Sequence, residues 1–183
     1  MDQVTAISAF VLAFALMLPA LTRLLSRWPR LFTAAKYAIL AVYVLANLYE
    51  TILFRPVKPG MTAEFELLWS YREALNIAGG LAVSDMELLV EILLNVLLYI
   101  PMGYLLPFVW PGLRPKRGRR LVSGRIVAIG FVCSVLTELA QLIFRIGLFE
   151  FDDMLNNTLG CLIGCVLYEI IQRRHDKRER APE

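Results

Sequence analysis

The sequence predicts an all-α membrane protein: a five-helix transmembrane bundle with an amphipathic or re-entrant segment on its outer face between the second and third helices. The chain has 183 residues, 58% of them hydrophobic, and a mean hydropathy of +0.60, which is too apolar for an ordinary soluble domain. A spanning helix needs roughly 20 mostly apolar residues. Five stretches meet this need, at residues 4–25, 34–54, 88–109, 126–144 and 154–172.

The first span and the tail set the bounds of the predicted membrane domain. The first begins with Met1-Asp2-Gln3 instead of a basic region and has no small-residue cleavage site, so we expect a retained span and not a cleaved signal peptide. We expect residues 1–172 to form one transmembrane domain and residues 173–183 to form a basic cytoplasmic tail.

The basic residues predict how the spans are oriented. They concentrate between the first and second spans, between the third and fourth spans, and in the tail. By the positive-inside rule these three segments are cytoplasmic, which places the N-terminus outside and the C-terminus in the cytoplasm. Binding of nucleic acid or anionic lipid is the alternative reading of such runs. Because no nucleic-acid-binding fold accompanies them, we expect no nucleic-acid partner.

The segment at residues 55–87 is the one long connector between spans. It opens with the sequence RPVKPG, through which no helix would continue. Residues 64–75 mix apolar and charged side chains and predict a short amphipathic helix at the outer interface, anchored by Trp69 and Tyr71. Residues 77–83 fit a hinge or a re-entrant piece, and residues 84–87 fit the capped start of the third span. A plain loop and a lid over the polar groups described next remain alternatives.

Almost all charged and amide groups within the spans lie at one depth, the outer end of each helix; Lys36 and Glu169, near the inner ends, are the exceptions. Such groups are costly in hydrocarbon, so they are expected to face the bundle interior and to mark a functional pocket. Polar contacts that merely hold helices together are the alternative. In the fifth span this polar end continues into Gly160 and Gly164, which permit close helix packing. The polar groups are Asn47, Glu50 and Arg55; Glu87, Glu91 and Asn95; Glu138, Gln141 and Arg145; and Asp152, Asp153, Asn156 and Asn157.

The cysteines and the histidine do not suggest a metal site. Cys133, Cys161 and Cys165 all fall within predicted spans. An odd number at helical spacing offers no disulfide framework, so we expect small packing residues. The single histidine, His175, lies in the tail away from them, which argues against zinc.

Three motifs in these spans resemble the VanZ-like family, small bacterial membrane proteins named for a teicoplanin-resistance protein of glycopeptide-resistance clusters. Residues 94–107 read LNVLLYIPMGYLLP and match the family's Asn-x5-Pro-x-Gly pattern. Residues 137–141 read TELAQ and are followed by DMLNNTLG at residues 153–160, and residues 51–55 read TILFR. The resemblance implies a multi-pass protein of the bacterial cytoplasmic membrane. Its characteristic polar positions here are Arg55, Asn95, Glu138, Gln141, Asp153 and Asn157.

The first functional hypothesis is an enzyme that acts at the outer leaflet on the head group of a lipid or a lipid-linked cell-wall precursor. Oxygen ligands suit Mg²⁺ or Ca²⁺, so Glu138 and Asp153 are the candidate metal ligands. Arginine would neutralise phosphate oxygens, and Glu91 or Asp152 would act as general base. The expected catalytic residues are Asn95, Glu138, Gln141, Asp153 and Asn157, and the expected substrate-binding residues are Arg55, Glu91, Arg145, Asp152 and Asn156.

The second hypothesis is a non-catalytic protein. The same pocket would bind a membrane lipid, a lipid-linked precursor or a lipoglycopeptide antibiotic, and the family resemblance implies a link to teicoplanin resistance. A small permease ranks last, because the apolar inner halves of the spans offer no continuing polar path.

Overall fold

The protein is a bundle of long helices. The computed structural model describes residues 13–14, 17–24, 27–53, 57, 63–75, 86–114 and 122–180. Within these residues four helices are long and apolar enough to cross a membrane: Arg30–Leu53, Leu88–Val109, Gly124–Phe144 and Phe151–Arg174. The predicted all-α membrane fold is therefore confirmed, as are spans two to five. Of the predicted first span, residues 17–24 are helical and most of the rest lies outside the described residues.

The helix ends follow local sequence signals. Helix α2 (Pro29–Leu48) starts with a proline, whose missing N–H costs nothing in the first turn, and it runs into a π-helical turn, η1 (Tyr49–Leu53). Helix α4 (Met86–Val109) is followed by a short 3₁₀ turn, η2 (Pro111–Leu113). Helix α5 (Gly124–Phe144) ends at Arg145, which has a φ of 57°. There Ile146 N–H donates to the Gln141 carbonyl, a C-cap usually built with glycine. Helix α6 (Phe151–Arg180) continues into the predicted tail as far as Arg180.

Helices α4 and α6 pack very closely. A Cβ on Gly160 would lie 2.0 Å from the Val96 carbonyl oxygen, and a Cβ on Gly103 would lie 1.9 Å from the Cys161 carbonyl oxygen. Only glycine fits at such distances, so the predicted small-residue surface of the last span is a helix contact.

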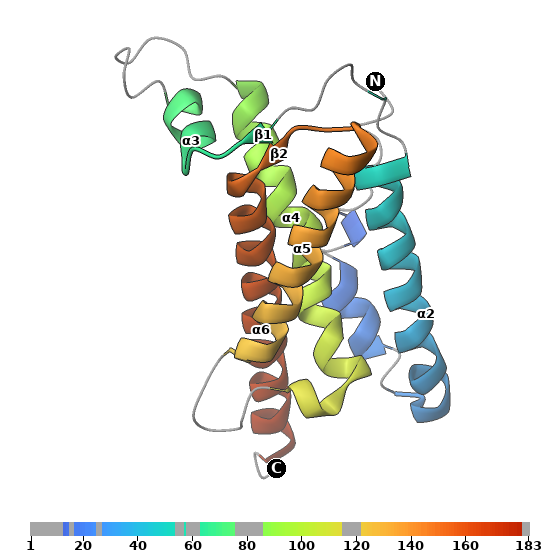
Figure 1. Ribbon diagram of the computed structural model, residues 1–183. Coiled ribbons are helices and arrows are strands. Elements are labelled where there is room, and N and C mark those ends of the chain that lie inside the picture. The colour runs from blue at the N-terminus through green and yellow to red at the C-terminus, as the bar shows by residue number, and fades with distance from the viewer. Residues whose placement is uncertain are drawn as a thin grey trace.

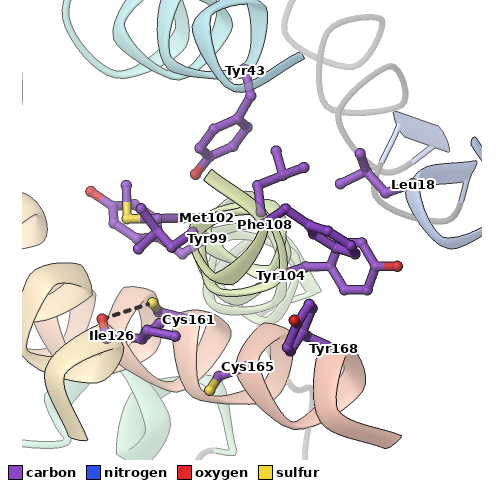
Figure 2. Packing of buried hydrophobic residues seen from close by; sticks show 12 residues of the cluster. Leu18, Tyr43, Tyr99, Met102, Tyr104, Phe108, Ile126, Cys161, Cys165 and Tyr168 are labelled. Atoms are coloured by element: carbon purple, nitrogen blue, oxygen red, sulfur yellow. Dashed lines mark hydrogen bonds between the residues drawn. The ribbon is translucent and has the colours of Figure 1, made fainter. Parts of the chain in front are cut away.

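Aromatic rings and sulfur atoms fill the space along this contact (Figure 2). The rings of Phe108 and Tyr168 meet edge to face with centroids 4.8 Å apart, a favoured geometry for aromatic pairs. Cys161 and Cys165 are buried and unbridged. They act as packing residues, as the sequence predicts.

One end of the bundle carries a small parallel sheet, which we call the strand end (Figure 1). Strand β1 (Ala63–Glu64) pairs with β2 (Phe149–Glu150), so that Ala63 faces Phe149 and Glu64 faces Glu150. Helix α3 (Trp69–Ala74) follows β1. We call residues 63–75 the strap. The end of α6 lies at the opposite end of the bundle.

The strap corrects the prediction of an amphipathic helix over residues 64–75. The helix is shorter than expected because the chain first pairs as a strand with β2 and then turns at Leu68, which has a φ of 61°. Neither feature has a local sequence signal. The predicted hinge at residues 77–83 and the predicted cap at Ser84 and Asp85 lie outside the described residues.

Candidate functional site

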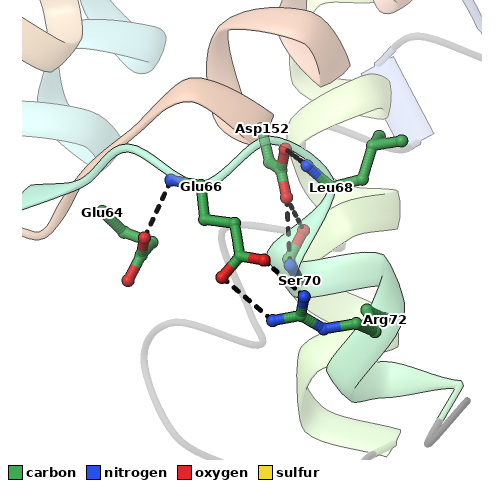
Figure 3. A network of polar contacts seen from close by, with 6 residues as sticks. All are labelled: Glu64, Glu66, Leu68, Ser70, Arg72 and Asp152. Carbon is green, nitrogen blue, oxygen red and sulfur yellow. Dashed lines mark hydrogen bonds and ion pairs between the residues drawn. The ribbon is translucent and has the colours of Figure 1, made fainter. Parts of the chain in front are cut away.

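Asp152 fastens the strap to the first turn of α6 (Figure 3). Its Oδ1 accepts a hydrogen bond from the Leu68 backbone N–H at 2.6 Å. Its Oδ2 accepts from the Ser70 N–H at 3.0 Å and from the Ser70 hydroxyl at 2.6 Å. Asp152 is fully buried, and the positive end of the α6 dipole favours its charge. The sequence suggested a substrate-binding residue or a general base here, whereas the structure commits both oxygens to the strap.

Asn156, one turn further along α6, makes a second contact with the strap. Its Oδ1 accepts a hydrogen bond from the Tyr71 hydroxyl. Its Nδ2 is buried and has no hydrogen-bond partner among the described residues. Burial, reinforced by the negative charges of Asp152 and Asp153, raises the pKa of Tyr71 above its ordinary value. Tyr71 therefore directs its hydroxyl towards α6, and its role as an interface anchor stays a prediction.

Asn95 and Asp153 join α4 to α6. The Asn95 Nδ2 donates to Asp153 Oδ1 at 2.5 Å. One turn deeper, Asn157 Nδ2 donates to the Ser134 hydroxyl of α5 at 2.9 Å. The polar groups predicted to share one depth thus connect three helices directly, and Asn157 Oδ1 has no partner in the described part of the chain.

Glu138 and Gln141 lie one turn apart on the buried face of α5. Glu138 Oε2 accepts from the Glu150 backbone N–H at 3.1 Å, which fixes β2 over the end of α5. Gln141 Nε2 donates to the Thr51 carbonyl at 3.1 Å, within the π-helical turn η1. Because a carbonyl can only accept, this bond fixes the orientation of the amide. The atom left without a partner among the described residues is therefore Gln141 Oε1.

Two other predicted site residues are exposed. Glu91 lies on α4, close enough to Glu150 for its charge to act on that carboxyl, and Arg145 lies at the end of α5. Arg55 lies outside the described residues.

Glu150 is not among the site residues that the sequence predicts. It is only 9% exposed. Burial, together with the negative charges of Asp153 and Glu91, raises the pKa of its carboxyl from 4.5 to about 8. Its position just before two aspartates, at the predicted start of a span, was the only signal in the sequence.

The expected Mg²⁺ or Ca²⁺ site, with Glu138 and Asp153 as ligands, stays a prediction. The described residues contain no group of three histidine, cysteine, aspartate or glutamate side chains placed to hold a metal ion. Glu138 and Asp153, the candidate ligands, each accept a hydrogen bond from the chain itself.

The polar layer coincides with the motifs that carry the family resemblance. Residues 11–172 match the VanZ/LLP1 family. This chain belongs to the VanZ/LLP1 family. The curated relative Protein VanZ of Enterococcus faecium is 27% identical over 143 residues, which cover 77% of this chain and 78% of that protein. No solved structure matches the chain. In this VanZ/LLP1 protein, the described motif residues Asn95, Glu138, Gln141, Asp153 and Asn157 lie on α4, α5 and α6.

Proposed function

We propose that this protein binds the polar head group of a lipid or a lipid-linked cell-wall precursor in the outer leaflet of the bacterial cytoplasmic membrane. The strand end would then lie outside and the C-terminus in the cytoplasm. One observation carries the proposal. Three amide side chains near this end are at least 97% buried, and each has one hydrogen-bonding atom without a partner in the described part of the chain. They are Gln141, Asn156 and Asn157.

Unpaired buried amide atoms need compensation. Leaving a buried donor or acceptor unsatisfied costs about 1–3 kcal/mol for each group, and native proteins keep few of them. Gln141 Oε1 and Asn157 Oδ1 accept, whereas Asn156 Nδ2 donates. A head group that carries both hydroxyl donors and oxygen acceptors would satisfy all three.

The carboxylates support binding more than metal-assisted chemistry. Asp152 accepts from the strap, Asp153 accepts from Asn95, and Glu138 accepts from the Glu150 N–H. These contacts join the strap and α4 to α6, and α5 to β2. The carboxylates therefore shape the site, and we derive no step through a metal ion.

Head-group hydrolysis or transfer is a second candidate function, and Glu150 favours it. A general acid works best when its pKa lies near the operating pH. With a pKa of about 8, Glu150 is mostly protonated at neutral pH and has a proton to donate to a leaving group.

The link to glycopeptide resistance is part of the proposal. If the protein holds a lipid-linked precursor, or the acyl tail of a lipoglycopeptide, it changes what the antibiotic can reach. Production of the protein in a teicoplanin-susceptible host should then lower susceptibility, and the Asp153→Asn variant should not.

Mass spectrometry of purified protein in nanodiscs tests the proposal. Wild type and Asp153→Asn are incubated with lipid extract and lipid-linked precursors, and retained and converted species are measured. Glu169→Gln is a matched control, because Glu169 is a buried carboxylate on the same helix, about 24 Å away at 1.5 Å per residue.

We expect wild type and Glu169→Gln to retain the same lipid and Asp153→Asn to lose it. A converted product that depends on Asp153 would select the second candidate. Equal retention by all three proteins, without conversion, would contradict both functions.

A further inference from the structure

The strap turns apolar side chains away from the protein. Phe65 is 64% exposed, Leu67 60%, Leu68 51% and Leu75 56%. The opposite face of α3 is buried through Ser70 and Ala74. This short segment is therefore amphipathic, and its apolar face is left largely exposed by the described part of the chain.

Leu68 reaches this orientation through a strained backbone. Its φ of 61° is uncommon for a residue with a branched side chain. The bond from its N–H to Asp152 holds it there. From Leu68, helical spacing brings Arg72 and Leu75 to the same face. Arg72 pairs with Glu66, and its aliphatic stem can lie along apolar surroundings while the charge stays in water.

The exposed face continues into the lipid-facing surface of a spanning helix. The Phe65 ring lies 5.8 Å from the Phe151 ring, centroid to centroid. Phe151 and Leu155 are themselves exposed on the first turns of α6. Because α6 is apolar and long enough to cross the membrane, its exposed apolar side chains face acyl chains. The strap extends this surface sideways at the strand end.

We propose that the strap is an in-plane membrane anchor. Phe65, Leu67, Leu68 and Leu75 enter the boundary between head groups and acyl chains of the leaflet at the strand end, and Asp152 holds the strap in this orientation. Apolar burial drives the contact. The charges of the strap do not, because Glu64, Glu66 and Glu73 outnumber Arg72 and would be repelled by anionic head groups. The proposal does not depend on which head group the protein binds.

Fluorescence quenching by brominated lipids tests this anchor. Trp28, Trp69 and Trp110 are first changed to phenylalanine, and a single tryptophan is then introduced by Leu67→Trp. Glu73→Trp in the same background is the control, because Glu73 is an exposed polar position on the same strap. Both proteins are placed in nanodiscs of lipids with or without bromine in the middle of the acyl chain.

We expect Leu67→Trp to lose most of its fluorescence in brominated nanodiscs and Glu73→Trp to keep most of its own. Retained fluorescence at both positions would overturn the anchor and would point to a protein partner on this face. Equal quenching at both positions would also overturn it, because the strap would then have no lipid-facing side.

The role of Asp152 is tested in the Leu67→Trp protein. Asp152→Asn weakens the bonds to Leu68 and Ser70, so quenching should fall while the melting temperature shows that the bundle is still folded. Ser70→Ala removes only the hydroxyl that donates to Asp152. It replaces Asp152→Asn in this test if that variant does not fold. Unchanged quenching in the folded variant would show that Asp152 does not hold the strap in this orientation.

Discussion

Glu150 has a carboxyl group whose environment changes its chemistry. Its pKa is about 8 in the folded protein, against an ordinary value of 4.5. The folded state therefore binds this proton more tightly than the unfolded state does. The stabilisation is complete below about pH 4.5 and is lost as the pH rises to about 8.

The Glu150→Gln variant mimics the protonated side chain. We expect it to match wild type at pH 5 and to be more stable at pH 9, by at least about 1 kcal/mol. Thermal unfolding in detergent across this pH range measures the difference. Glu73→Gln, at an exposed position, should follow wild type. Parallel pH profiles for Glu150→Gln and wild type would show that Glu150 ionises normally.

Asn95 is predicted to stabilise the fold through its hydrogen bond to the Asp153 carboxylate. Asn95→Leu removes the donor to a buried carboxylate, Asp153, and should destabilise the protein by about 1–3 kcal/mol. Replacing both partners of a buried hydrogen bond is less costly than removing one of them. The double variant Asn95→Leu, Asp153→Leu should therefore recover part of the loss in denaturant unfolding. Leu93→Ala, at an exposed site on the same helix, is the control. Simple additivity in the double variant would contradict the coupling.

The closest contact between elements, α4 against α6, depends on glycine. Gly160→Ala would place a Cβ 2.0 Å from the Val96 carbonyl oxygen, so the helices must separate. Overpacking of this kind typically costs about 1–3 kcal/mol. Gly124→Ala has nothing within 4 Å of its added Cβ and should be neutral or slightly stabilising. A melting temperature for Gly160→Ala as high as for Gly124→Ala would mean that the two helices are not packed this closely.

The long elements could be predicted from the sequence, whereas the strap could not. A predicted span at residues 88–109 matches the structure because hydropathy over some 20 residues is a strong local signal. The pairing of Ala63 with Phe149 joins residues far apart in the chain through strands of two residues, which are too short to show a period. The π-helical turn at Thr51 is likewise invisible in the pattern.

The sequence predicts where polar residues gather, but not the contacts that they make. The structure brings Asn95 and Asp153 into contact, as expected from the cost of polar groups in hydrocarbon. That cost could not show that Asp152 would turn to the strap while its neighbour Asp153 turned to α4. Adjacent residues on a helix point about 100° apart, and only the partner elements decide which contact each makes.

At the scale of the whole molecule, the ligand proposed for the site depends on which side of the membrane the strand end faces. The distribution of arginine and lysine predicts that this end lies outside and the end of α6 in the cytoplasm. Cysteines introduced singly by Glu73→Cys and Asp176→Cys test the orientation with a membrane-impermeant maleimide on intact cells.

We expect labelling of Glu73→Cys in intact cells and of Asp176→Cys only after permeabilisation. Wild type measures the background, because Cys161 and Cys165 are buried and Cys133 is half-buried within a spanning helix. The positive-inside preference acts through short loops rich in arginine and lysine, so reversing it would require a strong opposing signal. The opposite labelling pattern would place the strap and the polar layer in the inner leaflet. Neither extracellular wall precursors nor glycopeptide antibiotics would then reach the site directly, and its ligand would have to be a cytoplasmic-leaflet head group.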